Sequence, residues 1–124
     1  MIQTKRVYEP MTPEDGSCYL VERLWPRGIR KTDLKIVSWC RDVAPSTELR
    51  KWFSHDPGKW EEFKSRYRTE LSNQPEAWQP LLGAARSGTV TLLFSARDTE
   101  HNSALVLKEF LQERSRKPRT NRTK

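Results

Sequence analysis

The sequence has few of the features that mark metal-binding proteins or disulfide-stapled domains. Only two cysteines are present, Cys18 and Cys40, and they form no paired CxxC spacing. His55 and His101 do not complete a ligand set at the spacing of a metal finger, so we expect no bound metal. Two isolated cysteines are typical of a reducing compartment, and a single disulfide between them is the alternative.

Long apolar segments are also missing. The first ten residues, MIQTKRVYEP, contain no apolar core of a secretory signal. No apolar run in the sequence approaches the roughly 20 residues that are needed to cross a bilayer. We therefore expect a cytoplasmic protein that has no membrane partner.

The commonest catalytic and cofactor-binding motifs are absent as well. The sequence contains no GxxxxGKS or GxxxxGKT, no GxGxxG, no HExxH and no GxSxG. These motifs mark many nucleotide-binding proteins, zinc proteases and serine hydrolases. We expect no cofactor, and the sequence alone does not identify a reaction.

Basic side chains are concentrated near the C-terminus. Most of the net charge of +7 comes from residues 113–124, where six basic side chains accompany only Glu113. This segment contains Pro118 and no apolar residue, so we predict a disordered tail that follows a single domain of residues 1–112. A solvated end is the simplest interpretation of the tail, and an electrostatic contact with RNA or DNA is the alternative.

The apolar pattern predicts three strands. Residues 2–8 alternate as an edge strand does, and residues 18–25 form a second strand. Residues 89–96, TVTLLFSA, form a third strand, and their nearly continuous apolar character indicates burial on both faces. The link between the first two strands is too short for a helical crossover, so we predict that these strands pair antiparallel.

Four helices are predicted between and after these strands. They begin at Ser46, at Asp56, near Pro75 and at residue 99, and the last one ends at residue 112. The long helical connection favours parallel pairing of strands 18–25 and 89–96. We therefore expect an α/β fold with a small mixed sheet, in which a single layer of strands is packed by four helices.

Two loops are expected to meet at one edge of this sheet, because ligands of α/β proteins bind beyond the carboxyl ends of the parallel strands. The residues that we predict to bind an anion there are Arg23, Arg27, Gly28, Ser95, Arg97 and Asn102. Arginine matches the geometry of phosphate and carboxylate groups, and glycine allows the backbone to approach a ligand closely. The start of the last helix supplies free amides and the positive end of a dipole.

Structural roles for the same residues are open alternatives. Arg23 alternates with Glu22 on the predicted strand, so one of the two side chains is expected to point away from the site. Arg97 and Asp98 can form an ion pair at the start of the helix, or Asp98 can serve only as a cap.

For proton transfer, the first candidates are Asp33 and His101. Histidine is a common proton-transfer group, although a surface histidine in the first turn of a helix is more often inert. Cys40 lies beside Arg41 but has no adjacent histidine base, so the sequence gives little support for a nucleophile there.

Four stretches of the sequence resemble the YeaO-like family. They are KRVYEP, LVERLWPRGIRKTDL, APSTELRKWFSHDPGKWEEFKSRYRTEL and TLLFSARDTEHNSALVLKEFL, and they extend from about residue 2 to residue 112. The resemblance implies a compact α/β fold and an intracellular bacterial protein, but no established activity, substrate or cofactor. Glu22 stands where the family pattern leads us to expect Asp, and the basic tail resembles an addition to the family.

Three functions are compatible with these features. The first is a small-molecule enzyme or sensor domain that binds a phosphate- or carboxylate-bearing ligand, with nucleotides among the candidates. The second is a nucleic-acid accessory protein that contacts phosphates through residues 23–35 and the tail, and the third is a protein-interaction module. A concave pocket of converged arginines would favour the first, a convex basic stripe the second, and a large flat apolar patch the third.

Overall fold

The strands of the protein form one parallel sheet. The computed structural model describes the backbone of residues 1–121 and the side chains of residues 1–115. Its strands are β1 (Ile2–Arg6), β2 (Ser17–Leu20), β3 (Ser38–Trp39) and β4 (Val90–Phe94). They lie in the order β1-β4-β2-β3, and each neighbouring pair is parallel.

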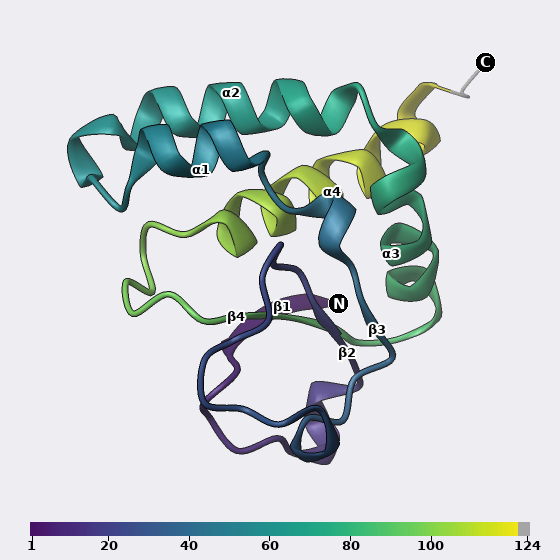
Figure 1. Cartoon of the computed structure of the whole chain (residues 1–124). Coiled ribbons are helices and arrows are strands. Elements are labelled where there is room, and N and C mark those ends of the chain that lie inside the picture. The colour runs from purple at the N-terminus through teal and green to yellow at the C-terminus, as the bar shows by residue number, and fades with distance from the viewer. Residues whose placement is uncertain (122–124) are drawn as a thin grey trace.

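The α-helices gather on one side of this sheet (Figure 1). They are α1 (Thr47–Phe53), α2 (Trp60–Ser72), α3 (Pro75–Ser87) and α4 (Ser103–Asn121). The opposite face is covered by the loops that follow β1 and β2 (Figure 1). The α/β class and the layer of strands packed by helices are therefore confirmed. Within residues 1–121, no helix has both the length and the apolar character that crossing a membrane requires.

The expected antiparallel pairing of the first two strands is wrong. β1 and β2 do not pair with each other. Each of them pairs with β4 instead, and both run parallel to it. The connection through residues 7–16 returns to the start of the sheet with only a 3₁₀ turn, Pro13–Asp15, in place of a helix. The sheet is thus wholly parallel rather than mixed. The predicted parallel pairing of segments 18–25 and 89–96 is confirmed as β2 against β4.

β4 occupies the centre of the sheet and is buried along its whole length. Val90, Leu92 and Phe94 belong to the apolar core on the helix side. Leu93 belongs to a second cluster that contains Leu20 and is packed by Trp25 and Trp39 from the loops. Alternate side chains of β4 therefore enter two cores, and the predicted burial on both faces is confirmed.

Several boundaries differ from the predicted ones. β2 ends at Leu20, and the next residues leave the sheet. α4 begins at Ser103 and continues past residue 112 to Asn121, into the segment predicted to be a disordered tail. Residues 122–124 of that segment lie outside the described residues, so the division of the chain at residue 112 stays a prediction.

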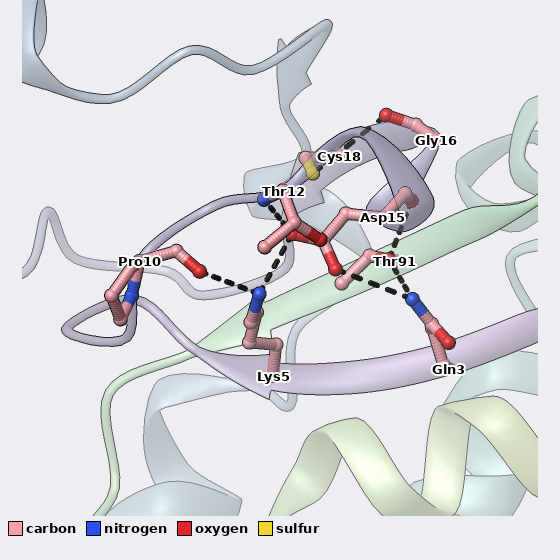
Figure 2. Close-up of polar contacts among 8 residues, drawn as sticks. All are labelled: Gln3, Lys5, Pro10, Thr12, Asp15, Gly16, Cys18 and Thr91. Carbon is pink, nitrogen blue, oxygen red and sulfur yellow. Dashed lines mark hydrogen bonds and ion pairs between the residues drawn. The ribbon is translucent and has the colours of Figure 1, made fainter.

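A buried cluster of hydrogen-bonded polar side chains connects the segment before β2 with β1 and β4 (Figure 2). The Asp15 carboxylate accepts hydrogen bonds from Lys5 Nζ and from the Thr12 amide, both at 2.8 Å. The Thr91 hydroxyl donates to the Asp15 carbonyl oxygen at 2.6 Å and accepts from Gln3 Nε2 at 2.9 Å. Every buried side-chain nitrogen or oxygen among the described residues has a hydrogen-bond partner. The polar atoms of this cluster therefore bind one another, and the cluster stabilises the fold.

Candidate functional site

A cavity of about 580 Å³ opens beyond the carboxyl ends of β2 and β4. Its walls come from the segments that follow these two strands, from α1 with the loop before it, and from the start of α4. The polar residues that line it are Glu22, Arg23, Arg27, Arg50, His55, Ser95, Arg97, Asp98, His101, Asn102 and Ser103. A volume of this size is typical of small-molecule sites.

The structure brings most of the predicted site residues to this cavity. They are Arg23, Arg27, Ser95, Arg97, His101 and Asn102. Their convergence follows from the parallel pairing of β2 with β4, which places both following loops at one edge of the sheet. That any of these residues binds a ligand stays a prediction.

Gly28 and Asp33 are not brought to the cavity. Gly28 has a φ of +81°, and a Cβ placed on it would meet no atom within 4 Å, so its freedom serves the local turn. Asp33 pairs with Arg30 Nε at 3.1 Å on the surface, where the Asp33 side chain is 53% exposed. Proximity in sequence to Arg27 placed both residues near the expected site, but the chain leaves the cavity after Arg27.

Arg23 holds one wall of the cavity in place. Its Nε donates to the carbonyl oxygen of Pro45 and its Nη2 to that of Ala44, each at 3.0 Å. These carbonyls directly precede Ser46, the N-cap of α1. The expectation that Glu22 or Arg23 points away is wrong, because the strand ends before them and both side chains line the cavity.

Three further arginines supply positive charge that no described carboxylate neutralises. Arg27 follows β2, Arg50 lies on α1 and Arg97 follows β4, and all three are exposed and line the cavity. None of them takes part in an ion pair with the side chains of residues 1–115. The alternative pairing of Arg97 with Asp98 is therefore not formed. Arg50 was missed in the sequence because only tertiary packing brings α1 to this edge.

Glu22 also lines the cavity, although it was not among the residues predicted to bind an anion. Its Oε2 accepts from the Ser95 amide at 2.8 Å, and its Oε1 accepts from the Ser95 hydroxyl at 2.6 Å. The two bonds join the segment after β2 to the end of β4. The Ser95 hydroxyl predicted to orient a ligand thus already donates its proton to Glu22.

Asp98 shapes the turn that precedes α4. Its Oδ1 accepts from the amides of Glu100 at 2.9 Å and His101 at 3.0 Å, and its Oδ2 lies 3.0 Å from His101 Nδ1. These contacts, led by the Glu100 amide, hold the pKa of the Asp98 carboxyl below its ordinary value. The His101 ring also meets Trp60 edge-on, with ring centroids 5.2 Å apart. Asp98 and Trp60 together fix the orientation of the imidazole.

Asn102 is the N-cap of α4. Its Oδ1 accepts from the Leu105 amide at 3.1 Å, and its Nδ2 donates to the Asp98 carbonyl oxygen at 3.0 Å. Both functions of the side chain are used within the protein. The position predicted to contact a ligand therefore contributes mainly by fixing where the helix begins.

The cap leads to a stability prediction. Asn102→Ala is expected to lower the free energy of unfolding by about 1–2 kcal/mol, because a buried cap loses both of its hydrogen bonds. Urea unfolding followed by circular dichroism measures the change. Thr99→Ala, at an exposed position in the same loop, is the control and is expected to stay within about 0.5 kcal/mol of the original protein. Equal stability of the two variants would contradict the assigned role of the cap.

The cysteines do not place a nucleophile in the cavity. Cys18 and Cys40 are free thiols, so the alternative of a disulfide is not realised. Burial raises the pKa of both thiols, which disfavours the reactive thiolate. Neither cysteine lines the cavity. In the part of the chain that the structure describes, no group of three or more His, Cys, Asp or Glu residues could hold a metal ion.

The chain is similar to several bacterial proteins that are named as uncharacterized. The uncharacterized protein YeaO of Escherichia coli is 44% identical over 111 residues, which are 90% of this chain and 96% of that protein. The uncharacterized proteins Mb3100c of Mycobacterium bovis and Rv3073c of Mycobacterium tuberculosis are each 42% identical over 113 residues, 91% of this chain and 95% of theirs. No solved structure matches the chain. A family described as the inactive DUF488-N3 subclade matches residues 1–124, and the chain therefore belongs to this YeaO-like family.

Proposed function

We propose that the cavity binds a small molecule that carries a phosphate or carboxylate group, and that the protein is a binding or sensor domain. The observation that carries this proposal is the convergence of Arg27, Arg50 and Arg97 on one cavity without a carboxylate partner. Like charges that are held near one another repel, and a bound anion removes that repulsion. The planar guanidinium group also matches the oxygen pairs of phosphate and carboxylate.

The start of α4 adds to the attraction for anions. Asn102 and Ser103 both line the cavity. The Asn102 side chain takes up the amide of Leu105, so the amides of Ser103 and Ala104 are the other donors of the first turn. A helix directs its partial positive charge toward this end. The arginines and the helix therefore act on the same ligand position.

Binding without catalysis is supported by the groups that are missing or occupied. Asp33, one of the two candidates for proton transfer, lies outside the cavity. Both cysteine thiols have a raised pKa. The family description also uses the word inactive. The cavity thus contains groups that attract an anion, while neither thiol nor Asp33 lies in it.

The nucleic-acid alternative has less support. Within residues 23–35, Arg30 pairs with Asp33, and Lys31 lies over the rings of Trp25 and Trp39. Arg27 lines the cavity instead of extending a convex basic stripe. The basic tail extends beyond the side chains that the structure describes. Four arginines that the structure describes, Arg23, Arg27, Arg50 and Arg97, line one cavity, as a site for an anionic small molecule requires.

Pyrophosphate tests the proposal because it presents anionic oxygens and no ring. Arg97→Ala is expected to weaken pyrophosphate binding about tenfold, since a charge-assisted hydrogen bond is lost. Isothermal titration calorimetry measures the affinity. Thermal stability should change little, because the Arg97 side chain forms no ion pair with the side chains of residues 1–115.

Lys51→Ala is the matched control for the charge. Lys51 is exposed on α1 and follows Arg50, but it does not line the cavity. Both substitutions remove one positive charge, so a general electrostatic effect would weaken binding equally in the two variants. Equal affinities in Arg97→Ala and Lys51→Ala, or no binding of pyrophosphate by the original protein, would reject the proposal.

A further inference from the structure

The cavity beyond β2 and β4 carries an excess of positive charge. Four arginines line it, and the carboxylates that line it are those of Glu22 and Asp98, so the excess is two charges when the lining histidines are neutral. Neither carboxylate forms an ion pair with an arginine among the side chains of residues 1–115. Ser95 donates to Glu22 through its amide and its hydroxyl, and two backbone amides donate to Asp98. A ligand with two negative charges therefore neutralises the cavity, whereas a ligand with one does not.

The cavity is also larger than an anionic group alone requires. Its volume of about 580 Å³ lies in the range of sites that enclose a drug-sized ligand. The arginines face this space from three segments, which are the residues after β2, the helix α1 and the residues after β4. A single phosphate group fills only a small part of such a volume. The rest of the volume is available to the remainder of the ligand.

The segment after β2 gives the cavity an apolar wall. Leu24 lines the cavity and its residue is 61% exposed, so a large apolar side chain faces water there. Trp25 beside it is half-buried, and its Nε1 donates to the Ile29 carbonyl oxygen, so only carbon atoms of the indole are left to contact a ligand. Ala96 adds a small apolar surface after β4. A ligand gains free energy when an apolar part of it covers such a surface.

We infer that the ligand is a phosphomonoester with an apolar organic part, small enough for the cavity to enclose it. This inference rests on the proposed anion-binding function and narrows it to one class of ligand. A phosphomonoester carries about two negative charges above its second pKa of about 6, whereas a carboxylate or a sulfate ester carries one. The phosphate dianion removes the excess charge of the arginines, and the apolar part covers Leu24.

Hexyl phosphate and hexyl sulfate test the charge of the ligand. They share a tetrahedral head group and an alkyl chain, and at about pH 8 they differ by one negative charge. Calorimetry on the full chain should show that hexyl phosphate binds at least about tenfold more tightly. Equal affinities for the two compounds would overturn the inference. If pyrophosphate still bound in an Arg97-dependent manner, the proposed function would remain.

Methyl, butyl, hexyl and dodecyl phosphate test the apolar part. The affinity is expected to rise at least about tenfold from methyl to hexyl phosphate, because a fully buried methylene group contributes about fourfold. The rise should stop before dodecyl phosphate, whose chain is longer than the cavity can enclose. A constant affinity along the series would overturn the inference. A rise that continues to dodecyl phosphate would indicate a lipid surface as the partner and would overturn the enclosed site.

Leu24→Ala tests the apolar wall directly. The ratio of the hexyl phosphate affinity to the methyl phosphate affinity is expected to fall at least about threefold, since the side chain that the alkyl group covers is removed. Val37→Ala is the matched control, because Val37 is 62% exposed and does not line the cavity, and it should keep the full ratio. A full ratio in a folded Leu24→Ala variant would overturn the inference. If that variant does not fold, the chain-length series on the original protein decides.

Discussion

Replacement of Gly16 by alanine is expected to lower the free energy of unfolding by about 3 kcal/mol. Gly16 has a φ of +64°, and a Cβ at this position would lie 2.3 Å from the carbonyl oxygen of Thr89. That oxygen accepts the Ser17 amide at 3.0 Å, a bond that opens the pairing of β2 with β4. The strain of the left-handed conformation and the overlap with the backbone therefore add, and neither backbone segment can move without disturbing the central strand.

Gly28 provides the control for conformational strain alone. It has a φ of +81°, and a Cβ there would meet nothing within 4 Å. Gly28→Ala should therefore cost only about 1 kcal/mol, the usual penalty of an L-residue in this region. Urea unfolding of both variants under the same conditions measures the difference. Similar losses in the two variants would show that the close approach to Thr89 relaxes without cost.

Asp15→Asn is the second substitution with a large expected effect. The Asp15 side chain is only 7% exposed and that of its partner Lys5 only 16%. Removal of the carboxylate charge leaves the Lys5 ammonium without its counter-ion, although it still donates to the Pro10 carbonyl oxygen at 2.6 Å. Breaking a buried pair in this way costs about 3 kcal/mol. Chemical unfolding at neutral pH measures the loss.

The exposed ion pair of α2 is the control for this substitution. Glu62 accepts from Arg66 one turn later on the helix, and both side chains are more than half exposed. Glu62→Gln should lower the free energy of unfolding by no more than about 0.5 kcal/mol. A loss as small as this in Asp15→Asn would contradict the structural role that Figure 2 indicates for the buried cluster.

The pH dependence of the same variant follows from the contacts of Asp15. The hydrogen bond from Lys5, and then that from the Thr12 amide, hold the pKa of the Asp15 carboxyl below its ordinary value of 3.8. Such a group stabilises the fold fully above its unfolded pKa, and this contribution is lost as the pH falls through the folded pKa. The stability difference from Asp15→Asn should thus be constant near neutral pH and shrink below about pH 3.8. A difference that persists unchanged in acid would exclude the ionised carboxylate as its cause.

Side-chain periodicity was sufficient to predict the central strand and the helices. The apolar run around Leu92 predicted burial on both faces, and β4 has it because one face meets helices and the other meets loops. The two-residue strand β3 was not predicted, because Ser38 and Trp39 are too short a segment to show an alternation. The pairing of β1 could not be read from the length of the following loop, because a later strand lies between β1 and β2.

The site residues that the sequence could predict are those whose position follows from the direction of the parallel strands. Residues that directly follow two parallel strands reach one sheet edge, and Arg27 and Arg97 did so. Arg50 could not be placed in this way, because its position depends on how α1 packs. The expectation that only one of Glu22 and Arg23 faces the site failed for another reason: β2 ends at Leu20, so strand alternation no longer governs the direction of the next side chains.

The order of the strands in the sheet also determines when the sheet can form during synthesis. β1 and β2 belong to the first 20 residues, yet the strand that pairs with both of them begins only at Val90. Pairings between such distant segments form slowly, because a long chain has to be ordered before they stabilise it. β1 has no other partner in the sheet. β1 therefore leaves the ribosome long before β4 does, and the pairing of these two strands is a late step of cotranslational folding.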